Sequence, residues 1–449
     1  MLSKRQILGL ILSLLFLSAA FSPQAQSYFY LQEEQRLPVG EPIELLLNLP
    51  PAVLHSINVS IKEGEKLLSL QGNPSGENAY RLGREVSPVL MEPGQVKLEL
   101  KLFDLIPLKQ ISVDIQPNLN LIPGGHSIGV LLRTEGVMVI GFSPVLDNKN
   151  EPSFPARDAG IELGDMIIEV NGQKVATDDR VKEIVGAWQP EDADIVFKVR
   201  RKDALLEKTV RPQYCLDTRT YRIGLFIRDN AGGVGTLTFY DPVSAKYGAL
   251  GHVITDSENN QALRIKQGKI MPATVESIQK AKRGFPGEKV GLFIENSNWG
   301  DININASCGI YGTVQKEIQN PLYPQGLPIA YANQIHPGPA EILTVVKGEK
   351  INKYTIEIEK ILNNRQDNKN MIIRINDAAL FAVTGGIIQG MSGSPIIQNG
   401  RIVGAVTHVF VNDPQRGYAV FIENMLFEAG ILPKEKTLGA LQGLSLFYA

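Results

Sequence analysis

The sequence has few of the residues that would build a disulfide framework or a metal cluster. Its 449 residues include two cysteines, Cys215 and Cys308, and neither has CxxC spacing or a neighbouring histidine. One disulfide could form in an exported chain, but two cysteines are no framework, and the pattern disfavours structural zinc and thiol catalysis. We therefore expect a protein that needs no metal and no cofactor.

The chain also lacks a strong charge of either sign. Lysine and arginine number 45 and aspartate and glutamate 47, which leaves a formal net charge of −2 at pH 7. The basic residues are scattered rather than gathered into a stripe with aromatic residues, so nucleic acid is not an expected partner. The length suggests about three domains of roughly 100 to 200 residues each.

A long uncharged apolar run stands at the start of the chain. Residues 1–27 hold two basic residues and then a mainly apolar run over residues 7–21. A run of about 15 residues is intermediate between a secretory signal and a spanning helix, which needs about 20. The stretch Ala25-Gln26-Ser27 is a poor cleavage site. In either case we expect a signal or membrane anchor, with the rest of the chain exported.

Residues 28–118 have the pattern of a small β module. Short strand-like runs are broken by turn signals such as Asn73-Pro74-Ser75-Gly76. No group of residues here carries chemistry, and His55 is most simply a strand or loop residue. The expected strands are Ile43–Leu47, Ile57–Ile61, Gln95–Leu102 and Ile111–Ile115.

Residues 119–213 resemble a PDZ domain. The stretch Ala159-Gly160-Ile161-Glu162-Leu163-Gly164-Asp165, followed by a strand-like run and Asn171-Gly172, is similar to the pattern of bacterial PDZ domains. Residues 181–188 predict the helix that lines a peptide groove. The segment 143–157 contains three prolines and makes the loop before Ala159 longer than this pattern usually has.

A PDZ domain binds peptides by strand addition, which suggests candidate binding residues. An extended peptide could pair with the edge strand beginning at Val130. The N–H groups of Ile128, Gly129 and Val130, just after the Pro123-Gly124-Gly125 turn, would then hold its terminal carboxylate. The alternative is a PDZ fold that only packs against its neighbour.

A serine between two glycines stands near the C-terminal end, in Gly390-Met391-Ser392-Gly393-Ser394-Pro395. Such a loop can expose the Ser392 hydroxyl while the N–H groups of Gly390 and Ser392 point into one small space, as in an oxyanion hole. Gly-Ser loops are also common turns. Here, however, a strand, an Asn399-Gly400 hairpin turn and a second strand follow, as expected for a β-barrel.

Candidate partners for this serine precede it in the chain. His252 ends the glycine-bounded turn Gly248-Ala249-Leu250-Gly251-His252, and Asp377 stands fifteen residues before Ser392. Nucleophile, base and orienting acid would thus follow the chain order His, Asp, Ser. His408 is the rival base, but its strand follows the nucleophile and forms one wall of the cleft in trypsin-like folds. We expect it to contact substrate or to pack.

The residues alone do not decide which acid orients His252. Asp256, four residues after His252, and Asp301 compete with Asp377. Asp377 could instead be the N-cap of a helix that begins at Ala378. The remaining histidines, His126 and His336, lie in turns without a matching motif.

The stretch GMSGSPIIQNGRIVGAVTHVFVNDPQRGYAVFIENML, with GALGHVITD upstream, resembles the SpoIVB peptidases (stage IV sporulation protein B) of endospore-forming bacteria. The likeness covers most of the chain. It implies a mostly β protein with an N-terminal membrane segment, the small β module, the PDZ domain and a chymotrypsin-like double β-barrel peptidase over residues 214–449. It also implies Asp377 as the third member of the triad, which we favour.

The expected mechanism is acyl transfer to water. His252 takes the proton from Ser392, whose oxygen attacks a peptide carbonyl, and the N–H groups of Gly390 and Ser392 stabilise the oxyanion. The resemblance further implies that the enzyme cleaves itself in its N-terminal region. It would also cut a regulator of the intramembrane protease that processes pro-sigma-K, in the space between the forespore and mother-cell membranes, with the PDZ domain controlling access to Ser392.

Two other classes of function compete with this interpretation. One is a membrane-tethered PDZ adaptor with an inert peptidase-like domain, which the joint presence of serine, histidine, aspartate and glycine loop disfavours. The other is a quality-control protease of the HtrA type. That family usually places its PDZ domain after the protease domain, whereas here the PDZ pattern comes first.

Overall fold

The computed structural model describes residues 33–433, except residues 44, 46–48, 71–72, 75–78, 83–87, 147–150, 256–261, 264, 295–296 and 363–364. The chain divides into two compact units: the first ends at Asn120 and also takes in Ala330–Ile335, and the second holds the rest. The expected anchor at residues 1–27 lies outside the described residues. None of the helices within the described ranges is both long and apolar enough to cross a bilayer.

The first unit consists of two small β-sheets with a shared core. Buried side chains alternate along its strands, as in Val96, Leu98 and Leu100, and the core joins residues of both sheets. The expected strand over residues 43–47 falls mostly outside the described residues. The larger sheet has the order β1 (Glu34–Pro38), β8 (Ile106–Gln116), β7 (Gly94–Leu102), β2 (Ile57–Glu63) and β5 (Ala79–Arg81), and the smaller β4 (Asn73–Pro74), β3 (Leu68–Leu70) and β6 (Val89–Leu90). Its short helices are α3 (Pro51–Leu54), η1 (Glu65–Leu67) and η2 (Ala332–Gln334).

Six strands of the second unit close a ring, which we call barrel 1. Each strand pairs with the next in antiparallel fashion, and the last pairs with the first. The order around the ring is β10 (Ser127–Phe142), β19 (Leu225–Asp241), β20 (Lys246–Ala249), β24 (Gly309–Val314), β23 (Gly300–Ala306) and β21 (Ile265–Gln279). The strand β22 (Glu288–Phe293) pairs with β21 outside this ring, and β9 (Asn120–Pro123) pairs with β19.

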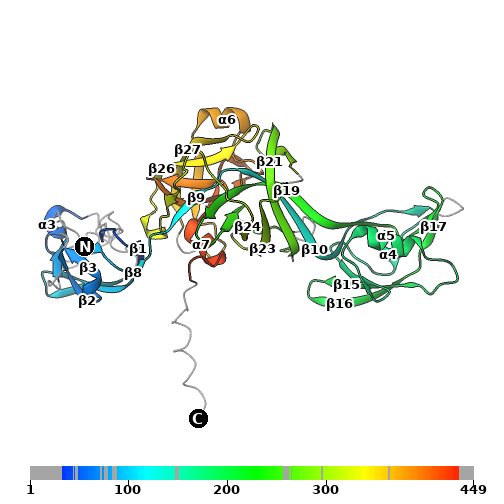
Figure 1. Ribbon diagram of the computed structural model, residues 1–449, viewed down its shortest axis with the longest axis horizontal. Coiled ribbons are helices and arrows are strands. Elements are labelled where there is room, and N and C mark those ends of the chain that lie inside the picture. The colour runs from blue at the N-terminus through cyan, green and yellow to red at the C-terminus, as the bar shows by residue number, and fades with distance from the viewer. Residues whose placement is uncertain are drawn as a thin grey trace, which may run out of the picture. The chain divides into compact units, whose positions relative to one another are not determined.

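Six further strands form a second closed barrel, barrel 2. The order around it is β26 (Gly338–Val345), β27 (Ile351–Ile361), β28 (Met371–Ile375), β31 (Asp413–Phe421), β30 (Arg401–Phe410) and β29 (Pro395–Gln398). The helix α6 (Ala378–Thr384) stands between β28 and β29, and α7 (Ile422–Glu428) follows β31 (Figure 1). Numbered along the chain, both rings have the same order: first, second, third, sixth, fifth, fourth. The expected double β-barrel is therefore confirmed.

The PDZ elements are inserted within the first hairpin of barrel 1. The strands β10 and β19 pair from Ser127 to Arg133 inside the barrel, and pair again from Met138 to Phe142 on the PDZ side. The PDZ core begins at Val137 and includes Ile223. The inserted elements are β11 (Val145–Leu146), β12 (Pro152–Ser153), α4 (Pro155–Asp158), β13 (Met166–Val170), β14 (Gln173–Lys174), α5 (Asp178–Gly186), β15 (Ile195–Arg201), β16 (Ala204–Val210), β17 (Gln213–Cys215) and β18 (Thr220–Arg222).

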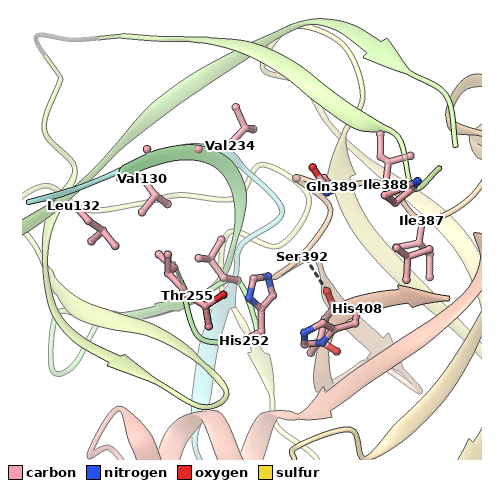
Figure 2. Close-up of a pocket in the computed structure, with 18 of the residues that line it drawn as sticks. Val130, Leu132, Val234, His252, Thr255, Ile387, Ile388, Gln389, Ser392 and His408 are labelled. Carbon is pink, nitrogen blue, oxygen red and sulfur yellow. Dashed lines mark hydrogen bonds between the residues drawn. The ribbon is translucent and has the colours of Figure 1, made fainter. Parts of the chain in front are cut away.

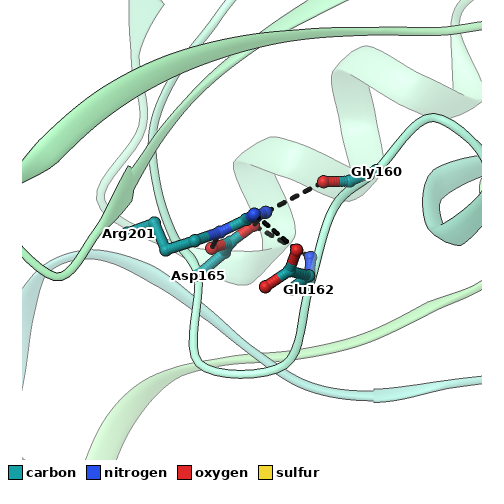
Figure 3. A network of polar contacts seen from close by, with 4 residues as sticks. All are labelled: Gly160, Glu162, Asp165 and Arg201. Carbon is teal, nitrogen blue, oxygen red and sulfur yellow. Dashed lines mark hydrogen bonds and ion pairs between the residues drawn. The ribbon is translucent and has the colours of Figure 1, made fainter.

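An ion-pair network explains the glycine-aspartate signature of this domain (Figure 3). The Asp165 carboxylate is fully buried and accepts two hydrogen bonds of 2.8 Å from Arg201. Arg201 also donates to the Gly160 carbonyl at 2.9 Å and pairs with Glu162. The bidentate pair raises the pKa of Arg201 and ties the turn to β15. The motif that identified the domain is therefore structural rather than part of a binding site.

The expected peptide-binding role of Ile128, Gly129 and Val130 is wrong. These residues pair with β19 on one side, as Gly129 does with Val234, and with β21 on the other, as Gly129 does with Met271. Both edges of this stretch are thus occupied, so no peptide can add to it. A glycine turn followed by a short apolar strand suits a PDZ entry and a barrel strand equally, and only the pairing partners distinguish them.

Candidate active site

The loop that carries Ser392 is held by two threonines of barrel 1. The hydroxyl of Thr236 donates to the Gly390 carbonyl at 2.6 Å, and that of Thr238 donates to the Gly393 carbonyl at 2.8 Å. The N–H of Thr236 donates to the Ser392 carbonyl at 3.0 Å. Gly390 and Gly393 have φ of +88° and +92°, which side chains other than glycine rarely adopt. Barrel 1 thus fixes a loop that belongs to barrel 2.

The backbone donors of this loop differ in whether they have partners. The N–H groups of Met391, Gly393 and Ser394 donate to carbonyl oxygens of the protein. Those of Gly390 and Ser392 donate to no acceptor within the described part of the chain. They are the two donors expected to form the oxyanion hole, and a preorganised hole requires donors that are left open for the substrate.

His252 follows β20 and has the tautomer of a general base. Its Nδ1 lies 2.8 Å from the carbonyl oxygen of Val253. Because a carbonyl only accepts, Nδ1 carries the proton, and Nε2 keeps its lone pair. Burial lowers the pKa of His252, which favours the neutral ring at pH 7. A backbone carbonyl therefore orients this imidazole.

Ser392 and His252 line one cavity of about 620 Å³ (Figure 2). The Ser392 hydroxyl donates to the Thr407 carbonyl at 2.7 Å, whereas no hydrogen bond joins it to His252. Walls from both barrels complete the cavity, including Val130 and Val234 of barrel 1. A rotation of the Ser392 side chain away from Thr407 is required before His252 can take its proton.

His408 lines the same cavity, next to His252. The two ring centroids are 5.1 Å apart and the ring planes are tilted by 46°. Burial, with a smaller effect of His252, lowers the pKa of His408 to about 4. The expectation that this strand forms a wall of the cleft agrees with its position.

The structure does not bring Asp377 into this cavity. One carboxylate oxygen of Asp377 accepts the N–H of Leu380 at 2.9 Å, so Asp377 is the N-cap of α6, and the other accepts the N–H of Thr355 at 3.2 Å. Asp301 accepts from Gln315 instead, and Asp256 lies outside the described residues. No carboxylate is among the described residues that line the cavity. Of the three expected triad residues, the structure gathers two.

A buried lysine behind the serine loop gave no signal in the sequence. Lys289, on β22, is 4% exposed, and its Nζ donates to Thr344 at 2.8 Å and to Thr236 at 3.4 Å. Its N–H donates to the Gln389 carbonyl, and its side chain fills the space where a Cβ on Gly390 would lie. Burial lowers the pKa of Lys289 to about 7. A lone lysine in an alternating strand looks like a surface residue, so only the tertiary structure reveals it.

Sequence comparisons agree with this geometry. Residues 219–426 match the model of the SpoIVB peptidase S55 family, and residues 151–201 match that of a PDZ domain. The S55 match covers just under half of the chain and contains both Ser392 and His252. The protein is a serine peptidase that carries a PDZ domain, which confirms the family resemblance stated from the sequence.

The solved structures that resemble this protein have low sequence identity to it. The active form of the Rv3671c protease from M. tuberculosis is 14% identical over 44% of this chain and 75% of that one, with a TM-score of 0.25. Its inactive form is 16% identical over 44% and 84%, with a TM-score of 0.24. Human heparin binding protein is 11% identical over 41% and 73%, with a TM-score of 0.22. Because these TM-scores are low, the fold is defined here by the strand pairings and not by the similarity to solved structures. No curated protein sequence matches the chain.

The peptidase presents an open strand edge in its PDZ part. From Leu225 to Arg228, β19 pairs with β10 on one side and with no described strand on the other. This stretch lies against α5, the helix expected near residues 181–188. An open edge beside a helix is the arrangement that accepts an added peptide strand.

Proposed function

We propose that this protein is an exported, membrane-associated serine endopeptidase in which Ser392 is the nucleophile and His252 the general base. The proposal rests on the protonation and the hydrogen bonding of the groups around one cavity. Ser392 and the proton-accepting Nε2 of His252 share it, and the N–H groups of Gly390 and Ser392 have no acceptor among the residues that the structure describes. These are the parts that acyl transfer requires.

The chemical steps follow from these positions. Once its side chain has turned from Thr407, Ser392 gives its proton to Nε2 of His252 and its oxygen attacks the substrate carbonyl. The N–H groups of Gly390 and Ser392 stabilise the oxyanion, and the imidazolium of His252 protonates the leaving amine. Water, activated by the same imidazole, then releases the acyl group. The Val253 carbonyl keeps the ring oriented throughout.

The substrates we propose are the protein itself and a membrane-bound regulator in sporulation signalling. Self-cleavage near the N-terminus would release the body from the apolar segment at residues 7–21. The regulator would be one that restrains the intramembrane protease acting on pro-sigma-K. The S55 family match and the apolar start of the chain support this proposal. In the PDZ part, a peptide would add to the edge of β19 from Leu225 to Arg228, rather than to Ile128–Val130.

The test compares the exported portion of the wild type with Ser392→Ala. We expect the wild type to shorten from its N-terminal side, as read by gel and N-terminal sequencing, and the variant to remain whole. A serine-directed fluorophosphonate should label the wild type alone, which tests the nucleophile without any knowledge of the substrate. Equal fragmentation and equal labelling of both chains would contradict the role of Ser392, and the PDZ adaptor would then be the better account.

A further inference from the structure

Two imidazoles, one from each barrel, face the cavity beside Ser392 (Figure 2). His252 follows the third strand of barrel 1 and His408 lies on β30 of barrel 2. Their ring centroids are 5.1 Å apart, and the 46° between their planes is far from a parallel stack. The cleavage chemistry uses His252 and leaves His408 without a task.

Both rings have a nitrogen available to an outside ligand. The hydrogen bond from Nδ1 of His252 to the Val253 carbonyl leaves Nε2 with an open lone pair. The ring nitrogens of His408 make no hydrogen bond within the described part of the chain. A neutral imidazole whose other nitrogen donates to a carbonyl is the usual form of a metal ligand.

The spacing of the rings suits one tetrahedral ion. With metal–nitrogen bonds of about 2 Å and a tetrahedral angle, two imidazole centroids on the same ion lie about 5 Å apart. The observed centroid separation of 5.1 Å meets this requirement. No group of three or more histidine, cysteine or acidic residues suitable for a metal occurs among the described residues. The ion would therefore keep positions for water or for the Ser392 oxygen.

We propose that His252 and His408 together bind Zn²⁺ and that this binding inhibits the peptidase. The inference rests on the proposed role of His252 as general base. The Nε2 lone pair that would accept the proton of Ser392 is the one the ion would take, so metal binding and catalysis exclude each other. Two protein ligands give a reversible site of micromolar rather than structural affinity. Mg²⁺ and Ca²⁺, which prefer oxygen ligands, do not inhibit.

Binding is tested first, without reference to activity, in the full exported chain carrying Ser392→Ala so that it cannot cut itself. Calorimetric titration with zinc chloride alone should show one ion per chain. Adding His408→Ala should weaken that binding at least tenfold, whereas adding His336→Ala, at an exposed histidine in a turn, should not. No binding by Ser392→Ala, or equal binding with and without His408, overturns the proposal.

Inhibition is tested on the wild type by its rate of fluorophosphonate labelling. Zinc should slow labelling, a chelator should restore it, and equal concentrations of Mg²⁺ or Ca²⁺ should leave it unchanged. For His408→Gln, the zinc concentration that halves the variant's own labelling rate should be at least tenfold higher than the concentration that halves the rate of the wild type. Unchanged zinc sensitivity in that variant overturns the proposal. If the wild type is not labelled before any zinc is added, the assignment of Ser392 as nucleophile is wrong. The zinc binding measured by calorimetry does not depend on that assignment.

Discussion

The two barrels of the peptidase have the same strand order but differ in what their connections carry. In both, the link between the third and fourth strands supplies a candidate catalytic residue: His252 after β20 in barrel 1, and Ser392 after β28 in barrel 2. Their first hairpins differ more. Barrel 2 turns from Val345 to Ile351 within a few residues, whereas barrel 1 accommodates the whole PDZ domain between β10 and β19. A ring of strands thus tolerates an insertion at a hairpin, because β10 and β19 still pair continuously from Ser127 to Arg133 within the ring, and the register shifts only beyond Arg133.

The two candidate catalytic residues are also held in place by different contacts. The serine loop is tied to Thr236 and Thr238 of barrel 1 and to the N–H of Lys289 on β22, whereas the ring of His252 is held by the carbonyl of the next residue. One catalytic group is thus positioned by the partner barrel and the other by its own backbone. The predictions below test that contrast.

The largest loss of activity is expected from a substitution at Gly393. A Cβ there would lie 2.1 Å from the Thr236 carbonyl oxygen, so Gly393→Ala must displace the loop from barrel 1. We expect fluorophosphonate labelling to fall at least about 100-fold, the scale on which an oxyanion donor is lost. Gly400→Ala is the matched control, since Gly400 also has a positive φ but has open space around it. Similar losses in both variants would mean that backbone strain, not the contact with Thr236, is responsible.

A smaller effect is expected at Lys289. Lys289→Met keeps the side-chain volume but loses the hydrogen bonds to Thr236 and Thr344, so kcat should fall about tenfold with KM little changed. The folded pKa of about 7 lies below the unfolded value, so the unfolded state binds more protons between pH 7 and about 10.4. The free energy of unfolding of the wild type should rise across that window relative to Lys289→Met.

Steady-state kinetics and denaturant unfolding at pH 7 and pH 9.5 check both expectations for Lys289. Lys282→Met, at an exposed lysine, serves as the control and should match the wild type in both measurements. Loss of substrate binding rather than of kcat in Lys289→Met would show that the lysine shapes the cleft, not the serine loop.

A change of about 1 kcal/mol is expected at Asp377. Asp377→Ala removes the N-cap of α6 and should lower the free energy of unfolding by about that amount, whereas Asp377→Asn, also a good N-cap, should not. Both variants should keep most of their activity, measured in parallel with chemical denaturation. A loss of about 10⁴-fold in kcat for Asp377→Asn would instead identify it as the orienting acid of the triad.

The smallest change in activity is expected when the inserted PDZ domain is removed. Removing residues 135–228 and joining Thr134 to Asp229 through an Asn-Gly turn gives barrel 1 a short first hairpin like that of barrel 2. Arg133 and Asn230 already face each other in the ladder, so the barrel should close. Circular dichroism should show a folded β protein, and Ser392 labelling should stay within about twofold of the wild type. A fold that collapses would show that barrel 1 depends on PDZ contacts.

Local chemistry in the sequence determined the parts of this protein that depend on backbone conformation. Gly390 and Gly393 require positive φ, Asn399-Gly400 forms a hairpin turn, and the Gly160–Asp165 turn needs its glycines and a buried carboxylate. Each requirement involves residues close together in the chain. The serine loop, the PDZ domain and the mostly β class were therefore predictable.

Tertiary structure alone decided which distant segments meet. The strand Ile128–Val130 suits a PDZ edge or a barrel equally, and packing against β19 and β21 places it in the barrel. Asp377 suits a triad or a helix cap, and its two oxygens are used by Leu380 and Thr355. Lys289 behind Gly390 and His408 beside His252 join residues about 100 or more positions apart. Such pairings follow from how barrels close and pack, and no local pattern encodes them.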